Sequence, residues 1–171
     1  MTHHARIAAT LAVVFLLMAL EARRSRRNER ALRARGAIEP SSDVYRLMRV
    51  VYPVAFIVPA LEGWMRGGVP PAVWAGGAAV FVAAKGLKYW AIAALGDRWS
   101  FRVLVVRGAP LVHAGPYRVM KHPNYAGVAG EIAGSALIMG GLLSGIALLA
   151  AFSWLMARRI RVEEQALAGV S

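Results

Sequence analysis

The sequence comprises 171 residues, 58% of which are hydrophobic, with a mean hydropathy of +0.49, a formal net charge of +12 and no cysteine. This composition leaves no room for a separate soluble domain and predicts a single all-α integral membrane domain over residues 1–171. The absence of cysteine excludes disulfide bonds, thiolate nucleophiles and cysteine-type zinc sites. The four histidines lack a paired helical spacing, so no metal site is expected.

Long apolar stretches predict the membrane spans. They run over residues 7–20, 50–64, 72–95 and 126–156. The last stretch exceeds the roughly 20 residues that one span needs and is interrupted at Gly140 and Gly141, so we expect a helical hairpin of two spans. The first stretch also has the length of a signal-peptide core, but it lacks a following cleavage site of small residues, so we expect it to be retained. The sequence thus predicts about five transmembrane helices.

The positive charges predict the orientation in the membrane. Nine arginines lie between Arg23 and Arg49, four arginines and one lysine lie between Arg98 and Lys121, and three arginines lie near the C-terminus. With five spans these segments share one side, which the positive-inside rule makes cytoplasmic. We therefore expect the N-terminus outside and the C-terminus inside a bacterial inner membrane. The same pattern explains the net charge without nucleic acid and predicts attraction to anionic membrane lipids.

Four ionisable residues fall inside the apolar stretches, where a charge is costly unless it faces a cavity or a partner. Lys85 and Lys88 are three residues apart on one helical face, so we expect that face to line a polar interior or to meet a carboxylate. Glu62 and Lys88 could instead extend to the membrane surface as structural residues. Glu131 follows Tyr125 by about one and a half helical turns and is a candidate for function.

A cluster of polar, aromatic and turn residues precedes the last apolar stretch. It reads GPY at residues 115–117 and KHPNY at residues 121–125. Proline lacks the N–H that a helix interior needs but suits the first turn, so Pro123 is expected to start the fourth span. The cluster is therefore expected at the cytoplasmic surface of the membrane.

A second polar group, RRIRVEE at residues 158–164, ends the fifth span. Because the two groups flank one hairpin, its folding brings them together, which predicts a cytoplasmic pocket for a zwitterionic ligand. The spacing of Arg159 and Glu163 alone also fits an ordinary i, i+4 pair on a helix surface.

The two groups together resemble the isoprenylcysteine carboxyl methyltransferase family of membrane enzymes. The resemblance covers residues 95–167 and rests on the GPY and KHPNY motifs and the hairpin. It also rests on a terminal pattern formed by Arg159, Glu163, Glu164 and Leu167. Lys121 stands where the family usually has arginine, which keeps the positive charge but loses the planar guanidinium fork.

Upstream motifs resemble a bacterial branch of the family that methylates long-chain polyketide phenols and pyrones. They read RNER at residues 27–30 and GAIE at residues 36–39, and they accompany HPNY and Glu131. Abundant alanine, arginine and glycine also point to a bacterial protein. A small lipid-like acceptor is therefore favoured over a prenylated protein.

The resemblance implies S-adenosylmethionine as the methyl donor, bound without a Rossmann domain. In agreement, the chain has no GxGxxG motif after a strand and too little soluble sequence for a βαβ unit. Arg159 would lie between donor and acceptor. The residues expected to bind the cofactor are Tyr117, His122, Pro123, Tyr125, Glu163 and Glu164.

The acceptor decides what chemistry the site needs. Methyl transfer from a sulfonium requires alignment of the nucleophile and exclusion of water. A carboxylate acceptor is already ionised and needs a cation such as Arg159 or Arg158, whereas a phenol or enol needs a general base, for which Glu131 or His122 is expected. Arg159, Glu131 and Tyr125 are the expected catalytic residues.

Two other functions fit the sequence. A phospholipid amine N-methyltransferase would share the donor and the membrane fold, whereas a non-enzymatic scaffold would bind no donor. Residues 23–40 fit either an amphipathic interfacial helix or a substrate rim that contains Asn28, Glu29 and Glu39. Trp99 fits either an interfacial aromatic belt or a substrate contact.

Overall fold

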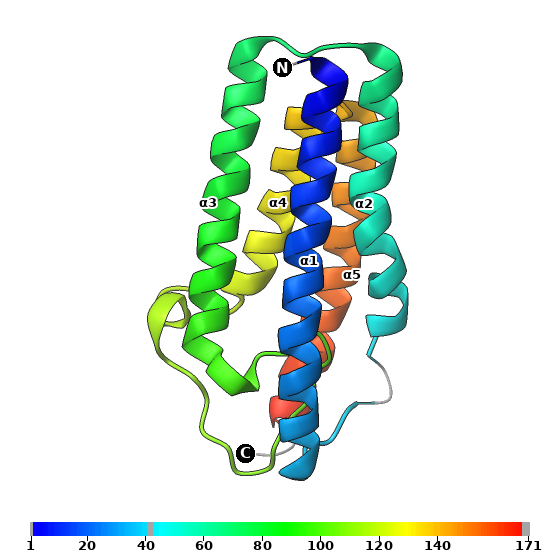
Figure 1. Ribbon diagram of the computed structural model, residues 1–171. Coiled ribbons are helices and arrows are strands. Elements are labelled where there is room, and N and C mark those ends of the chain that lie inside the picture. The colour runs from blue at the N-terminus through cyan, green and yellow to red at the C-terminus, as the bar shows by residue number, and fades with distance from the viewer. Residues whose placement is uncertain (1, 41–42, 169–171) are drawn as a thin grey trace.

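The computed structural model describes residues 2–40 and 43–168, which form a bundle of five α-helices (Figure 1). Two short 3₁₀ helices lie in the long connection between α3 and α4. Within the described ranges, β-structure is limited to one isolated bridge, between Ile38 and Val105. The predicted all-α architecture is confirmed. The elements are α1 (His3–Ala34), α2 (Tyr45–Arg66), α3 (Pro71–Leu95), η1 (Gly96–Arg98), η2 (Gly115–Arg118), α4 (Pro123–Met139) and α5 (Leu142–Ala168).

Four of the helices, α1, α2, α3 and α5, are long and apolar enough to cross a membrane. The remaining helix, α4, has 17 residues, which corresponds to about 25 Å at 1.5 Å per residue. It forms the short arm of the predicted hairpin with α5. Within residues 23–40, the segment that the sequence also allowed as an interfacial helix, residues 23–34 continue α1 without interruption.

The ends of the hairpin helices follow from local sequence. Pro123 is the first residue of α4, as predicted, and Gly140 ends that helix with a φ of 83°, a left-handed conformation that favours glycine. The carboxylate of Glu62 in α2 accepts hydrogen bonds from the backbone N–H groups of Leu143 and Ser144, at 3.2 and 2.7 Å. Glu62 therefore caps α5, a structural role that the sequence analysis did not predict.

Close approach between α3 and α4 depends on glycine. A Cβ added to Gly134 would lie 2.6 Å from the backbone N of Phe81, and one added to Gly130 would lie 2.7 Å from the Cβ of Ala84. Small residues permit such packing where lipid provides no hydrophobic drive for helix association. These two glycines hold α4 against the face of α3 that carries Lys85 and Lys88.

The hydrophobic core runs along the middle of the bundle. Val14 of α1, Phe56 of α2, Ile132 of α4 and Phe152 of α5 are each at most 3% exposed and belong to one cluster. Figure 1 places the N-terminus and the α2–α3 connection at one end of the bundle. The arginine-rich connections and the end of α5 lie together at the opposite end, called here the arginine-rich end.

Candidate functional site

A cavity of about 500 Å³ lies in the arginine-rich half of the bundle, lined by residues of all five helices and of the segment after η1. Its apolar wall includes Met18, Met48, Val128 and Phe152. Its polar wall includes several arginines and three tyrosines. Such a mixture of apolar walls and a few convergent polar groups is typical of a small-molecule site. The charged and hydroxyl-bearing lining residues are Ser25, Arg26, Glu29, Tyr45, Arg49, Tyr52, Lys88, Ser100, Arg102, Tyr125 and Arg159.

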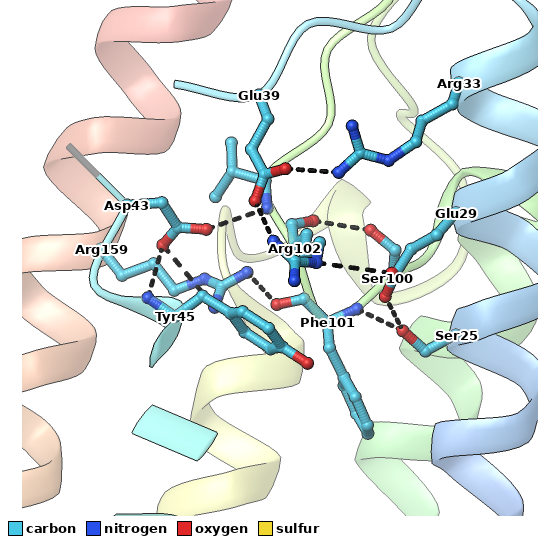
Figure 2. Close-up of polar contacts among 11 residues, drawn as sticks. Ser25, Glu29, Arg33, Glu39, Asp43, Tyr45, Ser100, Phe101, Arg102 and Arg159 are labelled. Carbon is cyan, nitrogen blue, oxygen red and sulfur yellow. Dashed lines mark hydrogen bonds and ion pairs between the residues drawn. The ribbon is translucent and has the colours of Figure 1, made fainter. Parts of the chain in front are cut away.

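The segment of residues 99–103 forms one side of the cavity and is fixed by side chains of other elements (Figure 2). The backbone N–H of Phe101 donates to Ser25 Oγ at 2.8 Å, and the backbone N–H of Val103 donates to Asp43 Oδ2 at 3.3 Å. Asn28 donates its Nδ2 to the carbonyl of Trp99 at 2.7 Å. Asn28 thus supports the cavity wall, and Trp99 lines the cavity.

An ion-pair network attaches the α1–α2 connection to the same segment (Figure 2). Arg102 pairs with Glu39 and lies 3.5 Å from Glu29 Oε2, and Arg33 also pairs with Glu39. Burial raises the pKa of the Glu39 carboxyl, but the hydrogen bonds from Arg102 and Arg33 outweigh it, so the pKa lies below its usual value. Of the three residues named for a substrate rim, Glu29 lines the cavity, whereas Asn28 and Glu39 do not.

Arg159 joins α5 to the cavity. Its side chain is buried, and its Nε donates to the hydroxyl oxygen of Tyr125 at 3.1 Å. It also donates to the carbonyl of Phe101 and lies 3.9 Å from Asp43 Oδ1. The alternative of an ordinary surface pair with Glu163 is therefore wrong, because these buried partners hold the guanidinium instead.

The predicted cofactor residues gather where α4 begins and α5 ends. Tyr125 donates its hydroxyl to Glu163 Oε2 at 2.9 Å, and His122 Nε2 lies 3.3 Å from Glu164 Oε1. Burial, followed by the nearby Glu163 carboxylate, raises the pKa of Tyr117 above its usual range, so its hydroxyl stays protonated. The hairpin thus brings the two polar groups together as predicted.

Only two of the predicted site residues, Tyr125 and Arg159, line the cavity described above. The other predicted cofactor residues do not line this cavity; they lie next to it, around Glu163. The hydrogen bond described for each of Glu163 and Glu164 uses one oxygen of its carboxylate. Two carboxylates, a histidine and a protonated tyrosine can bind ammonium and hydroxyl groups of a ligand.

Two buried polar atoms on the cavity wall have no hydrogen-bond partner among the described residues. They are the Oδ1 of Asn124 and the Nε1 of Trp99. Unpaired buried polar groups are rare in folded proteins and normally have a partner or a function. One of the two atoms accepts and the other donates.

A second polar cluster lies deeper between the helices. Lys85 and Lys88 of α3 each pair with Glu21 of α1, at 3.0 and 2.6 Å, and with Glu131 of α4, at 3.2 and 3.3 Å. Tyr52 of α2 donates to Glu131 Oε2 at 2.5 Å. The predicted meeting of the lysine face with carboxylates is confirmed. The alternative in which Lys88 extends to the membrane surface is wrong, since Lys88 is 1% exposed.

The sequence analysis missed Glu21 and Tyr52. Glu21 follows an apolar stretch directly and lies beside an arginine run, which makes it look like a surface residue. Two lysines that face inward need two carboxylates to balance their charge. Since Glu131 is one of these carboxylates, the requirement could have identified Glu21 as the second. Tyr52 offered no such signal, because tyrosine is common near the ends of membrane spans.

Metal chemistry finds no support in the described part of the chain, where no group of three potential ligands comes together.

Comparisons with known proteins add to this geometry. A sequence profile of the isoprenylcysteine carboxyl methyltransferase (ICMT) family matches residues 77–169. A Bacillus subtilis (strain 168) protein described as uncharacterized protein YpbQ is 34% identical over 161 residues, which make up 92% of this chain and 94% of that protein. No solved structure matches.

Proposed function

Because this chain belongs to the isoprenylcysteine carboxyl methyltransferase family, and is therefore a membrane methyltransferase of a lipid-like substrate, we propose that it methylates an oxygen atom of that substrate. The proposed donor is S-adenosylmethionine, which supplies an electrophilic methyl group on a sulfonium when bound. The proposed acceptors are a long-chain phenol or pyrone and a prenylcysteine carboxylate.

The contact between Arg159 and Tyr125 carries this proposal. Both residues line the cavity, and Tyr125 also donates to Glu163 in the group of predicted cofactor residues. A donor held beside Glu163 and an acceptor held in the cavity would therefore meet at this pair. Placing two reactants in contact within a closed site accounts for much of the rate gain in such displacements.

The donor side and the acceptor side of the contact between Arg159 and Tyr125 have different proposed roles. Glu163, Glu164 and His122 would hold the polar groups of the donor, and Tyr117 and Pro123 would form the wall beside it. Arg159 would orient the acceptor oxygen through its guanidinium. The buried surroundings exclude water, which would otherwise compete with the acceptor and weaken the electrostatic interactions.

The cavity favours an acceptor with an apolar tail. Met18, Met48 and Phe152 offer apolar surface next to a polar wall, and lipid-facing helices surround the cavity. An acceptor could thus enter from the membrane with its head toward Arg159. We also propose that the arginine-rich end faces the cytoplasm, where the donor is made.

The test uses purified protein in nanodiscs with isotopically labelled S-adenosylmethionine. The acceptors are an alkylresorcinol, an alkylpyrone, a farnesylcysteine analogue and phosphatidylethanolamine. Label on one of the first three, lost in Glu164→Gln and kept in the matched control Glu62→Gln, supports O-methylation. Label on phosphatidylethanolamine alone would identify an N-methyltransferase. No label on any acceptor and no donor binding would leave the scaffold function.

A further inference from the structure

The side chain of Tyr52 separates the cavity from the buried carboxylate of Glu131. Tyr52 and Lys88 both line the cavity, whereas Glu131 is 1% exposed and does not. The Tyr52 hydroxyl donates to Glu131 Oε2 at 2.5 Å, and Lys88 Nζ donates to the Tyr52 oxygen at 3.2 Å. A molecule in the cavity therefore meets two side chains, Tyr52 and Lys88, that both contact Glu131.

The cluster around Glu131 is balanced in charge and can take up a proton. Two ammonium groups, on Lys85 and Lys88, face two carboxylates, on Glu21 and Glu131. Glu131 Oε1 lies 3.2 and 3.3 Å from these ammonium groups but makes no hydrogen bond among the described residues. A proton on Glu131 would give the cluster a net positive charge next to the cavity.

The cavity wall favours a negative charge on a bound molecule. Five of the described lining residues are cationic, and Glu29 is the one carboxylate among them. Cations in a site shielded from water stabilise an anionic oxygen more strongly than they do in bulk water. The cationic lining residues are Arg26, Arg49, Lys88, Arg102 and Arg159.

We propose that Tyr52 relays a proton from a hydroxyl group of the acceptor to Glu131. The O–H bond of the acceptor breaks and its proton binds the Tyr52 oxygen, while the original Tyr52 proton moves to Glu131 Oε2. The electron pair of the broken bond stays on the acceptor oxygen, which becomes the nucleophile. This inference rests on the proposed methyl transfer and specifies its acceptor as a phenol or enol, since a carboxylate would have no proton to deliver.

The groups that face Tyr52 come from all the neighbouring helices. Glu131 belongs to α4, Lys85 and Lys88 belong to α3, and Glu21 belongs to α1. The side of Tyr52 toward α5 meets the ring of Phe152, which does not titrate. Glu131 is thus the carboxylate that accepts the Tyr52 proton.

The first experiment measures ionisation of a bound phenol without any donor. An alkyl-chain nitrophenol absorbs differently as phenol and as phenolate, so its spectrum in nanodiscs gives the ratio of the two forms at fixed pH. We expect wild-type protein to raise this ratio by about tenfold or more, the effect of a favourable charge environment. Tyr52→Phe should abolish the rise. Trp74→Phe, an exposed change on α3 outside the cavity, should retain it.

The second experiment measures methyl transfer with the same variants. Tyr52→Phe should lower kcat for an alkylphenol by about 100-fold, the scale of lost general-base catalysis. It should lower kcat much less for the more acidic nitrophenol, and donor affinity should stay unchanged. A merely structural role would lower both rates equally.

The outcomes separate this inference from the proposed function. Wild-type protein that methylates a phenol, together with a Tyr52→Phe variant of equal activity and equal phenolate ratio, would overturn the relay alone. A wild-type protein that methylates only the carboxylate of a farnesylcysteine analogue would overturn the relay and retain the O-methyltransferase. Absence of donor binding by wild-type protein would overturn both.

Discussion

The Nε of Arg159 lies 3.1 Å from the hydroxyl oxygen of Tyr125, and this contact joins α5 to α4 where the cavity meets the predicted cofactor residues. The Tyr125 hydroxyl in turn donates to Glu163. One short chain of hydrogen bonds thus connects the cavity wall with the paired glutamates at the end of α5. These hydrogen bonds are the structural basis for placing the acceptor on the side of the cavity and the donor on the side of Glu163.

Arg159→Lys should reduce catalysis without unfolding the protein. Lysine keeps the charge but cannot contact Tyr125, Phe101 and Asp43 together, because it lacks the planar fork. Loss of one hydrogen bond to a charged group costs about 1.5–3 kcal/mol, so kcat/KM should fall by at least about tenfold. Arg161→Lys, an exposed change in the same helix, is the matched control. Equal activity of the two variants would show that Arg159 is not part of the active site.

Lys88→Met should destabilise the bundle strongly. The change leaves Glu21 and Glu131 with one ammonium group between them, and breaking a buried ion pair costs about 3–5 kcal/mol. The double variant with Glu21→Gln restores charge balance and should recover part of this loss. Equilibrium unfolding in mixed micelles measures both free energies. A double variant less stable than Lys88→Met would contradict the account of the cluster.

The stability contributed by Glu39 should depend on pH. The hydrogen bonds from Arg102 and Arg33 lower its pKa in the folded state from the usual value of 4.5. Ionised Glu39 therefore stabilises the fold above pH 4.5, and this contribution is lost as the pH falls through the lowered pKa. Wild-type protein should unfold at a higher temperature than Glu39→Gln at neutral pH. The difference should shrink as the pH drops below 4.5, and a constant difference down to pH 2 would contradict this prediction.

The hairpin and its site were largely predictable from the sequence. Two glycines interrupt the last apolar stretch, and Pro123 marks the start of α4. A hairpin was therefore expected to bring the start of α4 close to the end of α5. The buried cluster around Glu131 was predictable only in part. Which carboxylate pairs with Lys85 and Lys88 depends on how α1 is aligned along α3, and this alignment is set by packing between distant segments. The sequence indicates that a second carboxylate is needed, but it does not fix this alignment.

The proposed orientation can be tested with single cysteines, because the chain has none of its own. Gly68→Cys lies in the exposed α2–α3 connection, and Ala109→Cys lies in the exposed connection between α3 and α4. In intact bacterial cells, a membrane-impermeant maleimide should label Gly68→Cys and spare Ala109→Cys. After lysis it should label both. The reverse pattern in intact cells would place the arginine-rich end outside.

The most direct test of the central claim is the transfer of a labelled methyl group from S-adenosylmethionine to an alkylphenol by purified wild-type protein and by Glu163→Gln. We predict labelled methyl ether with the wild-type protein. With the variant we predict a rate at least about tenfold lower together with weaker donor binding, because Glu163 connects Tyr125 to the donor side. Equal rates and equal donor affinities for the two proteins would contradict the placement of Glu163 in the donor site. Absence of both donor binding and labelled product with every acceptor tested would contradict the proposed function.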